Sequence, residues 1–584
     1  MLPLSETLLT ILTARITEAA RAAFGPDVPL PDPLVLPTRD PQHGDYSTPA
    51  AMSAAKVLGK NPFELAEQLA AALDVADVAG PPEVVRPGFV NLRLRPEWLA
   101  IQVAAAVGDD RLGLAPVAAP ERVVVDYSSP NLAKEMHVGH LRSTIIGDAL
   151  ANVFEHLGHD VERVNHVGDW GAQFGMLLVH LEDLRAEGRD LDMNGVEAFY
   201  REANVRDKDD AEFHERARNR VVELQNGEPD ARATWAELVE LTERNNQVVY
   251  DLLGIEGLVL RGESFYQPML DEVVAELDRQ GLLVEDQGAK VVFVPGFTNK
   301  EGEPLPIIVQ NRHGGYGYAT TDLAAIRHRV GELGSDRVLY VVDIGQSQHF
   351  AMVFAVARMA GWVPTDVELS HVPFGLVLGE DGKRLRTRSG ENVRLRELVL
   401  EAVDGAKAFV VARAEERGDP VPDDLDHVAA TIGIGAVKYA DLSQNRQSNY
   451  VFSYEKMLSL KGNTAPYLQY AYARMRSILR EAGWGDGPPS SPSVKLTHDA
   501  EVELAKKLVA TSDILGRMTE EYAPNHLCAH LYELSQAYNQ FYEHCPVLKS
   551  DEPLRSSRLA LCDATSRTLK VGLGLLGVGV LERI

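Results

Sequence analysis

Two histidines, His137 and His140, are the residues whose type and spacing most directly indicate chemistry. They stand where a short apolar strand, residues 122–126, gives way to a long helical pattern. The start of a helix offers free backbone N–H groups and the positive end of a dipole, and imidazole N–H groups add donors for a phosphate oxygen. Gly139 between them leaves room for a flat ring to lie on the backbone. As a bare tetrapeptide, however, the pair is explained equally well as surface histidines in a turn.

A second group of cations lies in residues 381–396, where six basic residues accompany two acidic ones. The surrounding part of the chain is acidic, so this segment is a local basic patch of the kind that attracts phosphate. A solvated basic loop is the alternative, and we favour a phosphate-facing loop. The six basic residues are Lys383, Arg384, Arg386, Arg388, Arg394 and Arg396.

Two other patterns do not indicate sites. Gly572–Gly577 matches G-x-G-x-x-G, but only seven residues follow it, too few for a dinucleotide-binding unit. A group of histidines and cysteines fits no common zinc spacing and lies in helical context, so we expect structural roles and no zinc or other resident metal. Its members are His526, Cys528, His530, His544 and Cys545.

The elements around the histidines predict a βαβ unit. The strand at 122–126 is followed by a loop over 127–136, a long helix from Leu141 and a second strand over 161–167. Residues 181–250 are helical in pattern and acidic, which indicates an insertion. Further predicted elements are strands at 88–94, 291–294 and 339–342, a helix over 349–361, a linker over 108–120 and helices from about residue 400 onward.

The composition excludes several classes of protein. The chain has 584 residues, which predicts several domains, and 45% of them are hydrophobic. Its three cysteines predict a reducing compartment rather than a disulfide framework. The first helix is amphipathic rather than signal-like, and the absence of any long apolar run predicts no membrane contact, so we expect a cytoplasmic protein.

The charge is uneven along the chain. With 58 Lys+Arg and 85 Asp+Glu, the net charge is −27, which taken alone argues against a nucleic-acid partner. Residues 1–120 carry −5 and residues 121–454 carry −22, whereas residues 455–584 are neutral. Such asymmetry predicts domains with different partners.

The segment from Ser129 to His140 resembles the "HIGH" region of class I aminoacyl-tRNA synthetases, and in its Ser-Pro-Asn and Lys134 it resembles the bacterial-type arginyl-tRNA synthetases. This region comprises Pro130, Asn131, Leu132, Ala133, Lys134, Glu135, Met136, His137, Val138, Gly139 and His140. Other segments similar to that family follow in its order, so the resemblance spans essentially the whole chain. They are Gly44–Ser47, His166–Gly175, Gly262–Ser264, Tyr318–Asp322, Gly435–Tyr439 and Gly462–Tyr467.

The chain departs from the class I pattern at the second signature, Lys-Met-Ser-Lys-Ser. The matching segment, residues 383–390, has Thr387 in place of the second lysine. Arginyl enzymes commonly lack that lysine, and the resemblance gives its role to Lys134. The charge that develops on a leaving pyrophosphate needs a neighbouring cation, whichever segment supplies it.

The resemblance also implies the substrate sites. Glu263, Tyr318 and Asp322 would form the arginine pocket, because a guanidinium needs carboxylates that can accept two hydrogen bonds together. Asn131 and Gln346 would hold the amino and carboxyl end of arginine. Spacing alone favours plainer roles, with Asp322 as a helix N-terminal acid and Glu263 as a solvated turn residue.

A helix expected from Thr464 interleaves aromatic and basic side chains. Tyrosines stack on unpaired bases while arginines hold phosphates, so we predict tRNA contacts for Tyr467, Tyr470 and Arg474. Ordinary helix packing is the alternative, and some of the tyrosines must face the core.

Together these inferences predict an α/β fold with a Rossmann-like parallel-sheet catalytic core, a helical insertion, an N-terminal α/β domain and a C-terminal all-α bundle. The expected domains are an N-terminal tRNA-contacting domain (1–115), a catalytic domain (120–395, with an insertion at about 176–260), a stem-contact region (396–454) and an anticodon-binding domain (455–584).

The implied activity is that of a monomeric arginine–tRNA ligase. Arginine reacts with Mg²⁺-ATP to give arginyl-adenylate, and the arginyl group passes to the terminal adenosine of tRNA-Arg. His137, Gly139 and His140 would bind ATP, and the catalytic groups would be Lys134, His137, His140, Lys383, Arg386 and Arg388. Two alternatives stay open: an adenylate-forming enzyme for another amino acid, and an inactive tRNA-binding paralogue, against which the histidine pair argues.

Overall fold

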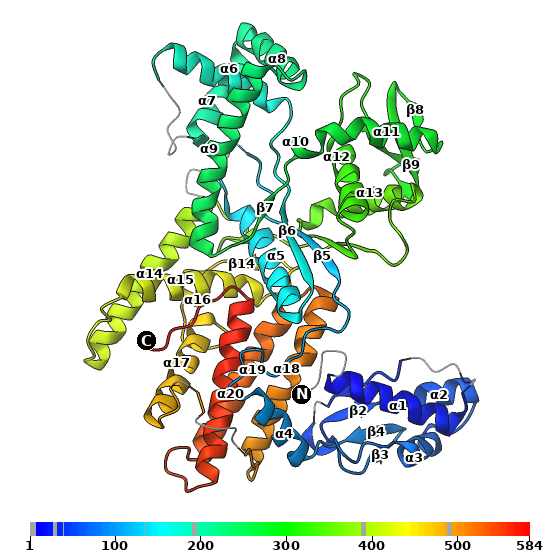
Figure 1. Ribbon diagram of the computed structural model, residues 1–584, viewed down its shortest axis with the longest axis vertical. Coiled ribbons are helices and arrows are strands. Elements are labelled where there is room, and N and C mark those ends of the chain that lie inside the picture. Colours follow the sequence, from blue (N-terminus) through cyan, green and yellow to red (C-terminus); the bar gives the residue numbers. More distant parts are fainter. Residues whose placement is uncertain are drawn as a thin grey trace.

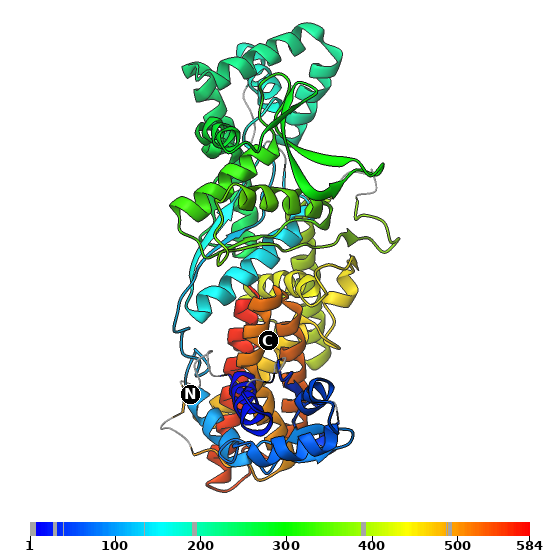
Figure 2. The same cartoon turned by 90° about the vertical axis from the view of Figure 1, so that its right-hand side faces the viewer.

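The computed structural model describes residues 7–26, 28, 32–38, 40–132, 135–189, 196–386, 393–485, 487–488 and 493–584. The molecule is elongated, with a parallel sheet in its middle and a helical insertion at one end (Figures 1 and 2). At the other end the N-terminal domain lies beside the C-terminal helical bundle. The predicted fold class is therefore confirmed.

The central sheet has five parallel strands in the order β12-β11-β5-β6-β7. Strands β6 and β7 follow β5 on one side, whereas the later strands β11 and β12 lie on the other side. The order of the strands thus reverses between β5 and β11, which is the topological switch point of the sheet. Ligands of such sheets bind at the carboxyl ends of the two strands that flank this point. The strands are β5 (Arg122–Asp126), β6 (Asp160–Asn165), β7 (Val259–Leu260), β11 (Arg337–Tyr340) and β12 (Glu368–His371).

The helices that follow these strands position the site. Helix α5 (Val138–Leu157) begins three residues before the predicted start at Leu141, because His137 caps it. Helix α12 (Tyr318–Arg327) runs into a π-helical turn, His328–Glu332, and helix α13 (Ser347–Met359) lies close to the predicted range 349–361.

One predicted strand belongs to a second, smaller sheet. Residues 291–294 belong to β9 (Ala289–Thr298), which pairs antiparallel with β8 (Val284–Asp286) and β10 (Pro304–Gln310). This small sheet is separate from the parallel core. A short apolar run predicts a strand but not its partners, since these depend on hairpin connections.

The acidic insertion is a helical unit with its own apolar core. Its helices are α6 (Gln173–Ala186), α7 (Val196–Asp209), α8 (Ala211–Gln225) and α9 (Pro229–Leu253). Buried Phe174, Leu177 and Phe213 are among the side chains of this core. The chain then returns to the sheet through β7.

The two terminal domains have the predicted characters. In the N-terminal domain, α1 (Leu8–Phe24), α2 (Ala50–Leu58), α3 (Pro62–Ala72) and α4 (Pro96–Ala106) accompany an antiparallel sheet of β1 (Leu36–Pro37), β2 (Tyr46–Thr48), β4 (Phe89–Leu92) and β3 (Glu83–Val85). The C-terminal part contains α14 (Leu395–Arg417), α15 (Leu425–Leu442), α16 (Tyr454–Met457), α17 (Ala465–Glu481), α18 (Asp499–Glu521), α19 (Asn525–His544) and α20 (Leu554–Leu575). None of the helices in the described ranges is both long and apolar enough to cross a membrane.

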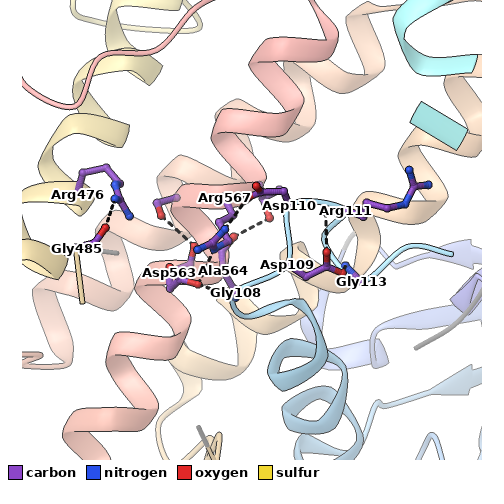
Figure 3. Close-up of polar contacts among 12 residues, drawn as sticks. Gly108, Asp109, Asp110, Arg111, Gly113, Arg476, Gly485, Asp563, Ala564 and Arg567 are labelled. Carbon is purple, nitrogen blue, oxygen red and sulfur yellow. Dashed lines mark hydrogen bonds and ion pairs between the residues drawn. The ribbon is translucent and has the colours of Figure 1, made fainter. Parts of the chain in front are cut away.

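The linker after α4 is fastened to two other parts of the molecule, and Figure 3 shows its contacts with α20. The Gly108 N–H donates to Asp563 Oδ2 on α20 over 3.0 Å, and Arg567 Nε donates to the same oxygen over 2.9 Å. Arg567 also pairs with Asp110 at 2.6 Å. Further along, Arg111 donates to the His156 carbonyl near the end of α5 over 2.7 Å. The linker therefore joins the bundle to α5, the helix that His137 caps.

We expect Asp563→Ala to lower the free energy of unfolding by about 2 kcal/mol, because it leaves a backbone N–H and a guanidinium without their buried acceptor. Chemical denaturation followed by circular dichroism measures this. Asp110→Ala is the matched control: its side chain is 74% exposed, whereas that of Asp563 is fully buried, so its loss should cost about 0.5 kcal/mol or less. Equal losses for the two variants would contradict this account of the linker.

Candidate active site

A pocket of about 340 Å³ lies at the switch point between β5 and β11, where the order of the strands reverses. Residues that follow β5 line one side, and residues that follow β11 line the other, as expected for a parallel sheet. The lining also includes one arginine of the predicted basic loop, Arg384. The lining residues are Ser128, Ser129, His137, Val138, Gly139, His140, Arg142, Ser143, Val341, Val342, Asp343, Phe374, Gly375, Leu376, Val377 and Arg384.

The two histidines cap α5 reciprocally. The His137 N–H donates to His140 Nδ1 over 3.1 Å, and the Gly139 N–H donates to His137 Nδ1 over 3.0 Å. Because each Nδ1 accepts a hydrogen bond, the proton of each neutral ring is on Nε2. The rings lie 4.1 Å apart. A Cβ at Gly139 would lie 2.7 Å from the His137 ring, so only glycine fits between them. The helix start thus carries two oriented imidazole donors.

The loop before these histidines has an unusual backbone. Ser128 and Ser129 have positive φ angles of 72° and 45°, which side chains other than glycine rarely adopt. The Ser128 N–H donates to Ser143 Oγ over 2.9 Å, and the Ser129 N–H donates to Asn165 Oδ1 over 3.0 Å. This conformation turns the chain away from the end of β5.

A buried ion pair joins this loop to α12. Asp126, the last residue of β5, lies 2.7 Å from Arg329 in the π-helical turn after α12, and both side chains are almost inaccessible to solvent. Asp126 Oδ1 also accepts a hydrogen bond from Ser129 Oγ over 3.1 Å. The position of α12 is therefore tied to the loop that precedes the histidines.

The predicted basic loop lies beside the histidines. Backbone hydrogen bonds pair Val138 N–H with the Val393 carbonyl and Leu395 N–H with the Met136 carbonyl, both over 2.9 Å. Arg394 forms an ion pair with Glu135 at 3.1 Å. These contacts bring the end of the basic segment against the start of α5.

The basic side chains of that loop line two neighbouring hollows. Lys383 and Arg386 line a hollow next to the main pocket, and Arg384 lines both. Arg384 was absent from the predicted catalytic set, although the basic run that contains it was the signal. Ala133, Lys134, Thr387 and Arg388 lie outside the described residues.

Three carboxylates gather at the predicted arginine pocket. Glu263 begins α10 (Glu263–Tyr266), and its N–H donates to the Val167 carbonyl over 3.1 Å. Burial, together with the nearby charges of Asp169 and Asp322, raises the pKa of Glu263 to about 8. Asp169 was not predicted. It is buried and accepts hydrogen bonds from the N–H and the hydroxyl of Ser264, which fixes the turn that carries Glu263. Such a cluster suits a cationic ligand.

The other residues that were predicted to bind arginine differ in their exposure to solvent. Asp322 lies on α12 and its Oδ2 is 2.6 Å from His349 Nε2, a contact that the sequence did not indicate. Asn131 forms a backbone bridge with Gly168, next to Asp169. Tyr318, one turn before Asp322, is 75% exposed, and Gln346 is also exposed at the start of α13. The carboxylates are thus assembled, whereas Tyr318 and Gln346 stand open to solvent.

The residues predicted to contact tRNA line one groove of about 1010 Å³ between α14, α17 and the C-terminal residues. Tyr467, Tyr470 and Arg474 all take part in it. Arg417 of α14 lies 6.0 Å from the Tyr470 ring and adds further positive charge. Tyr472, by contrast, is buried, as expected for some of these tyrosines.

Comparison with known proteins gives the family. The description "tRNA synthetases class I (R), catalytic domain" matches residues 102–454, "DALR anticodon binding domain" matches residues 468–584, and "Arginyl tRNA synthetase N terminal domain" matches residues 10–94. The chain belongs to the arginyl-tRNA synthetase family. The predicted resemblance is therefore confirmed.

Individual relatives agree with this family. The "Arginine--tRNA ligase" of a Synechococcus species is 52% identical over 582 residues, which cover 99% of each chain, and that of Thermosynechococcus vestitus is 53% identical over 583 residues, again 99% of each. Among solved structures, the arginyl-tRNA synthetase of Plasmodium falciparum has a TM-score of 0.86 with 30% identity and 98% coverage of both chains. That of Thermus thermophilus has a TM-score of 0.83 with 26% identity and covers 99% of this chain and 100% of its own.

We expect His140 to stay neutral across the physiological range. Burial and the neighbouring His137 lower the pKa of its ring to about 3. Below about pH 6.5 the ring is therefore protonated in the unfolded chain but stays neutral in the folded protein. Because the unfolded state binds the extra proton, His140 lowers the free energy of unfolding as the pH falls below about 6.5. NMR of histidine-labelled protein, with the signal assigned through His140→Gln, measures this. The same ring in denaturant is the control, and a midpoint above about pH 5 in the folded protein contradicts the assignment.

Proposed function

We propose that this chain joins L-arginine to tRNA-Arg with Mg²⁺-ATP as the second substrate. The observation that carries this proposal is the cluster of Asp169, Glu263 and Asp322, which the loop before His137 and His140 reaches through the backbone bridge of Asn131 with Gly168. The cluster suits a guanidinium and the histidine pair suits a phosphate chain. The naming of the close relatives as arginine–tRNA ligases supports the same activity.

In the first step the arginine carboxylate attacks the α-phosphate of ATP and pyrophosphate leaves, giving arginyl-adenylate. No enzyme nucleophile is needed, so the protein contributes position and charge. The Nε2–H groups of His137 and His140 donate to phosphate oxygens, and Gly139 lies under the adenine. Negative charge grows on the leaving pyrophosphate. The cations assigned to it are Lys134, Lys383, Arg384, Arg386 and Arg388.

In the second step the 2′-hydroxyl of the terminal adenosine attacks the adenylate carbonyl, and AMP leaves. The hydroxyl proton is released as the ester forms. The groove of Tyr467, Tyr470 and Arg474 holds the distant anticodon end, through stacking on unpaired bases and contacts with phosphates. We place the N-terminal domain, residues 1–115, and the region 396–454 along the body of the same tRNA.

Selection of arginine follows from the geometry of its side chain. Glu263 and Asp322 accept hydrogen bonds from the planar guanidinium, which the point charge of lysine cannot satisfy as well. Asn131 and Gln346 hold the amino and carboxyl end, and Tyr318 completes the pocket. Because Tyr318 and Gln346 are exposed without substrate, we expect them to be covered when arginine binds. We further propose that one chain suffices for activity and that the protein works in the cytoplasm, where its three buried free cysteines stay reduced.

A charging assay tests this function. Purified protein with ATP, Mg²⁺ and tRNA-Arg should charge the tRNA with arginine and reject lysine by a factor of about 10⁴, because unpaired buried carboxylates penalise a ligand that lacks their donors. A panel of the twenty amino acids covers the alternative of another amino-acid substrate. Binding of tRNA without consumption of ATP would instead indicate an inactive paralogue. Parallel arginine-dependent ATP–pyrophosphate exchange, with and without tRNA, separates activation from transfer.

We expect the KM for arginine to fall as the pH rises toward 8. The raised pKa of Glu263, about 8, keeps this acid neutral at pH 6, and a guanidinium favours its ionised form, so binding releases a proton. Below the pKa this gives a change of up to about tenfold per pH unit. Steady-state charging at saturating ATP measures it. In Glu263→Gln the pH dependence should disappear, and the KM for ATP serves as the internal control; an unchanged profile in that variant contradicts the assignment.

A further inference from the structure

A histidine outside all the predicted sites contacts one of the predicted arginine-binding carboxylates. His349 Nε2 lies 2.6 Å from Asp322 Oδ2, which links the first turn of α13 to α12. Both side chains are largely shielded from solvent. Among the described residues, no hydrogen bond reaches the other oxygen, Asp322 Oδ1.

We propose that His349 is a positioning residue for arginine: it holds Asp322 Oδ2 so that Oδ1 is presented to the guanidinium. This rests on the proposed function, since it requires that Asp322 contacts arginine. His349 acts through Asp322 and does not itself contact the reacting atoms.

The need for such an anchor comes from electrostatics. Asp322 lies close enough to Glu263 to raise the pKa of that acid, so the two carboxylates repel each other when both are charged. Without an anchor, rotation about the Asp322 side chain would separate them and lose the geometry for one guanidinium. A lysine or arginine at this position would occupy the carboxylate with a permanent charge and compete with the substrate. An imidazole N–H holds one oxygen and leaves the other available.

His349 is itself well placed for this task. Its ring meets Phe350 edge-on with centroids 5.4 Å apart, and Phe350 is buried and stacked on His371 at 5.1 Å. Gln346, predicted for the other end of arginine, immediately precedes α13 and lies three residues before His349. One turn of chain therefore reaches both ends of the proposed substrate.

His349→Ala should raise the KM for arginine about tenfold, because a charge-assisted hydrogen bond to the anchored carboxylate is lost. The turnover number should change less than about threefold and the KM for ATP less than about twofold, since neither the histidine pair nor the basic loop is touched. His349→Gln, whose amide N–H can replace Nε2–H, should restore the KM for arginine to within about threefold of the wild type. Steady-state charging with tRNA-Arg measures all of these.

Two further variants make the test specific. In an Asp322→Asn background, His349→Ala should add little, because residues that act through one contact are non-additive. His371→Ala is the matched packing control: His371 stacks on the same Phe350 but bonds to the Val342 carbonyl instead of Asp322. It should leave the KM for arginine within about twofold of the wild type.

Several outcomes overturn the proposal. They are an equal rise in the KM for ATP, additive effects of His349→Ala and Asp322→Asn, a failure of glutamine to rescue, or an equal effect of His371→Ala. A raised KM for arginine in Asp322→Asn with a normal one in His349→Ala removes only the role of His349. An unchanged KM in Asp322→Asn removes the assignment of Asp322 under the proposed function, and the role of His349 with it.

Discussion

The buried pair of Asp126 and Arg329 is the interaction on which the rest of the site depends. Removing two charges from water is costly, and the loss of either partner would leave an uncompensated buried charge. Here one partner ends β5 and the other follows α12. The first also holds Ser129 in its left-handed conformation, and that turn leads to the histidines. The pair thus links the loop that precedes the histidines to the turn that follows α12, the helix that carries Asp322.

The sequence predicted what depends on local pattern. The strand at 122–126, the helix after His140 and the all-helical C-terminal part follow from apolar periodicity, and the histidine pair follows from its place between a strand and a helix. What it missed depends on packing between distant segments. Asp169 contacts Ser264 across 95 residues, and His349 contacts Asp322 from another helix. The separation along the sequence does not indicate a contact in either case. The strand at 291–294 was predicted, but a short apolar run does not specify its partners, which are β8 and β10.

The net charge of the chain and its local charges lead to different predictions about binding of a polyanion such as tRNA. The overall charge of −27 argues against a polyanion, yet the acidic residues have specific uses. Asp169, Glu263 and Asp322 make up the proposed pocket for a cation, and many other acids lie in the helical insertion. Positive charge is concentrated where phosphates would be, in the loop around Lys383 and in the groove around Arg474. The distribution of charge, rather than its sum, is informative for a protein with substrates of both signs.

The linker between the N-terminal domain and the catalytic domain is more than a flexible tether, because it makes specific contacts of its own. Residues 108–111 bond to α20 and α5, and the N-terminal domain makes its own contacts with α18 through Asp45–Lys506 and Leu9–Asp513. Covalent continuity is therefore not the only connection between this domain and the rest of the molecule. A cut within the linker would break the peptide chain but leave the contacts of Asp45 and Leu9 with α18 in place. The N-terminal domain is thus docked on the bundle as well as tethered to it.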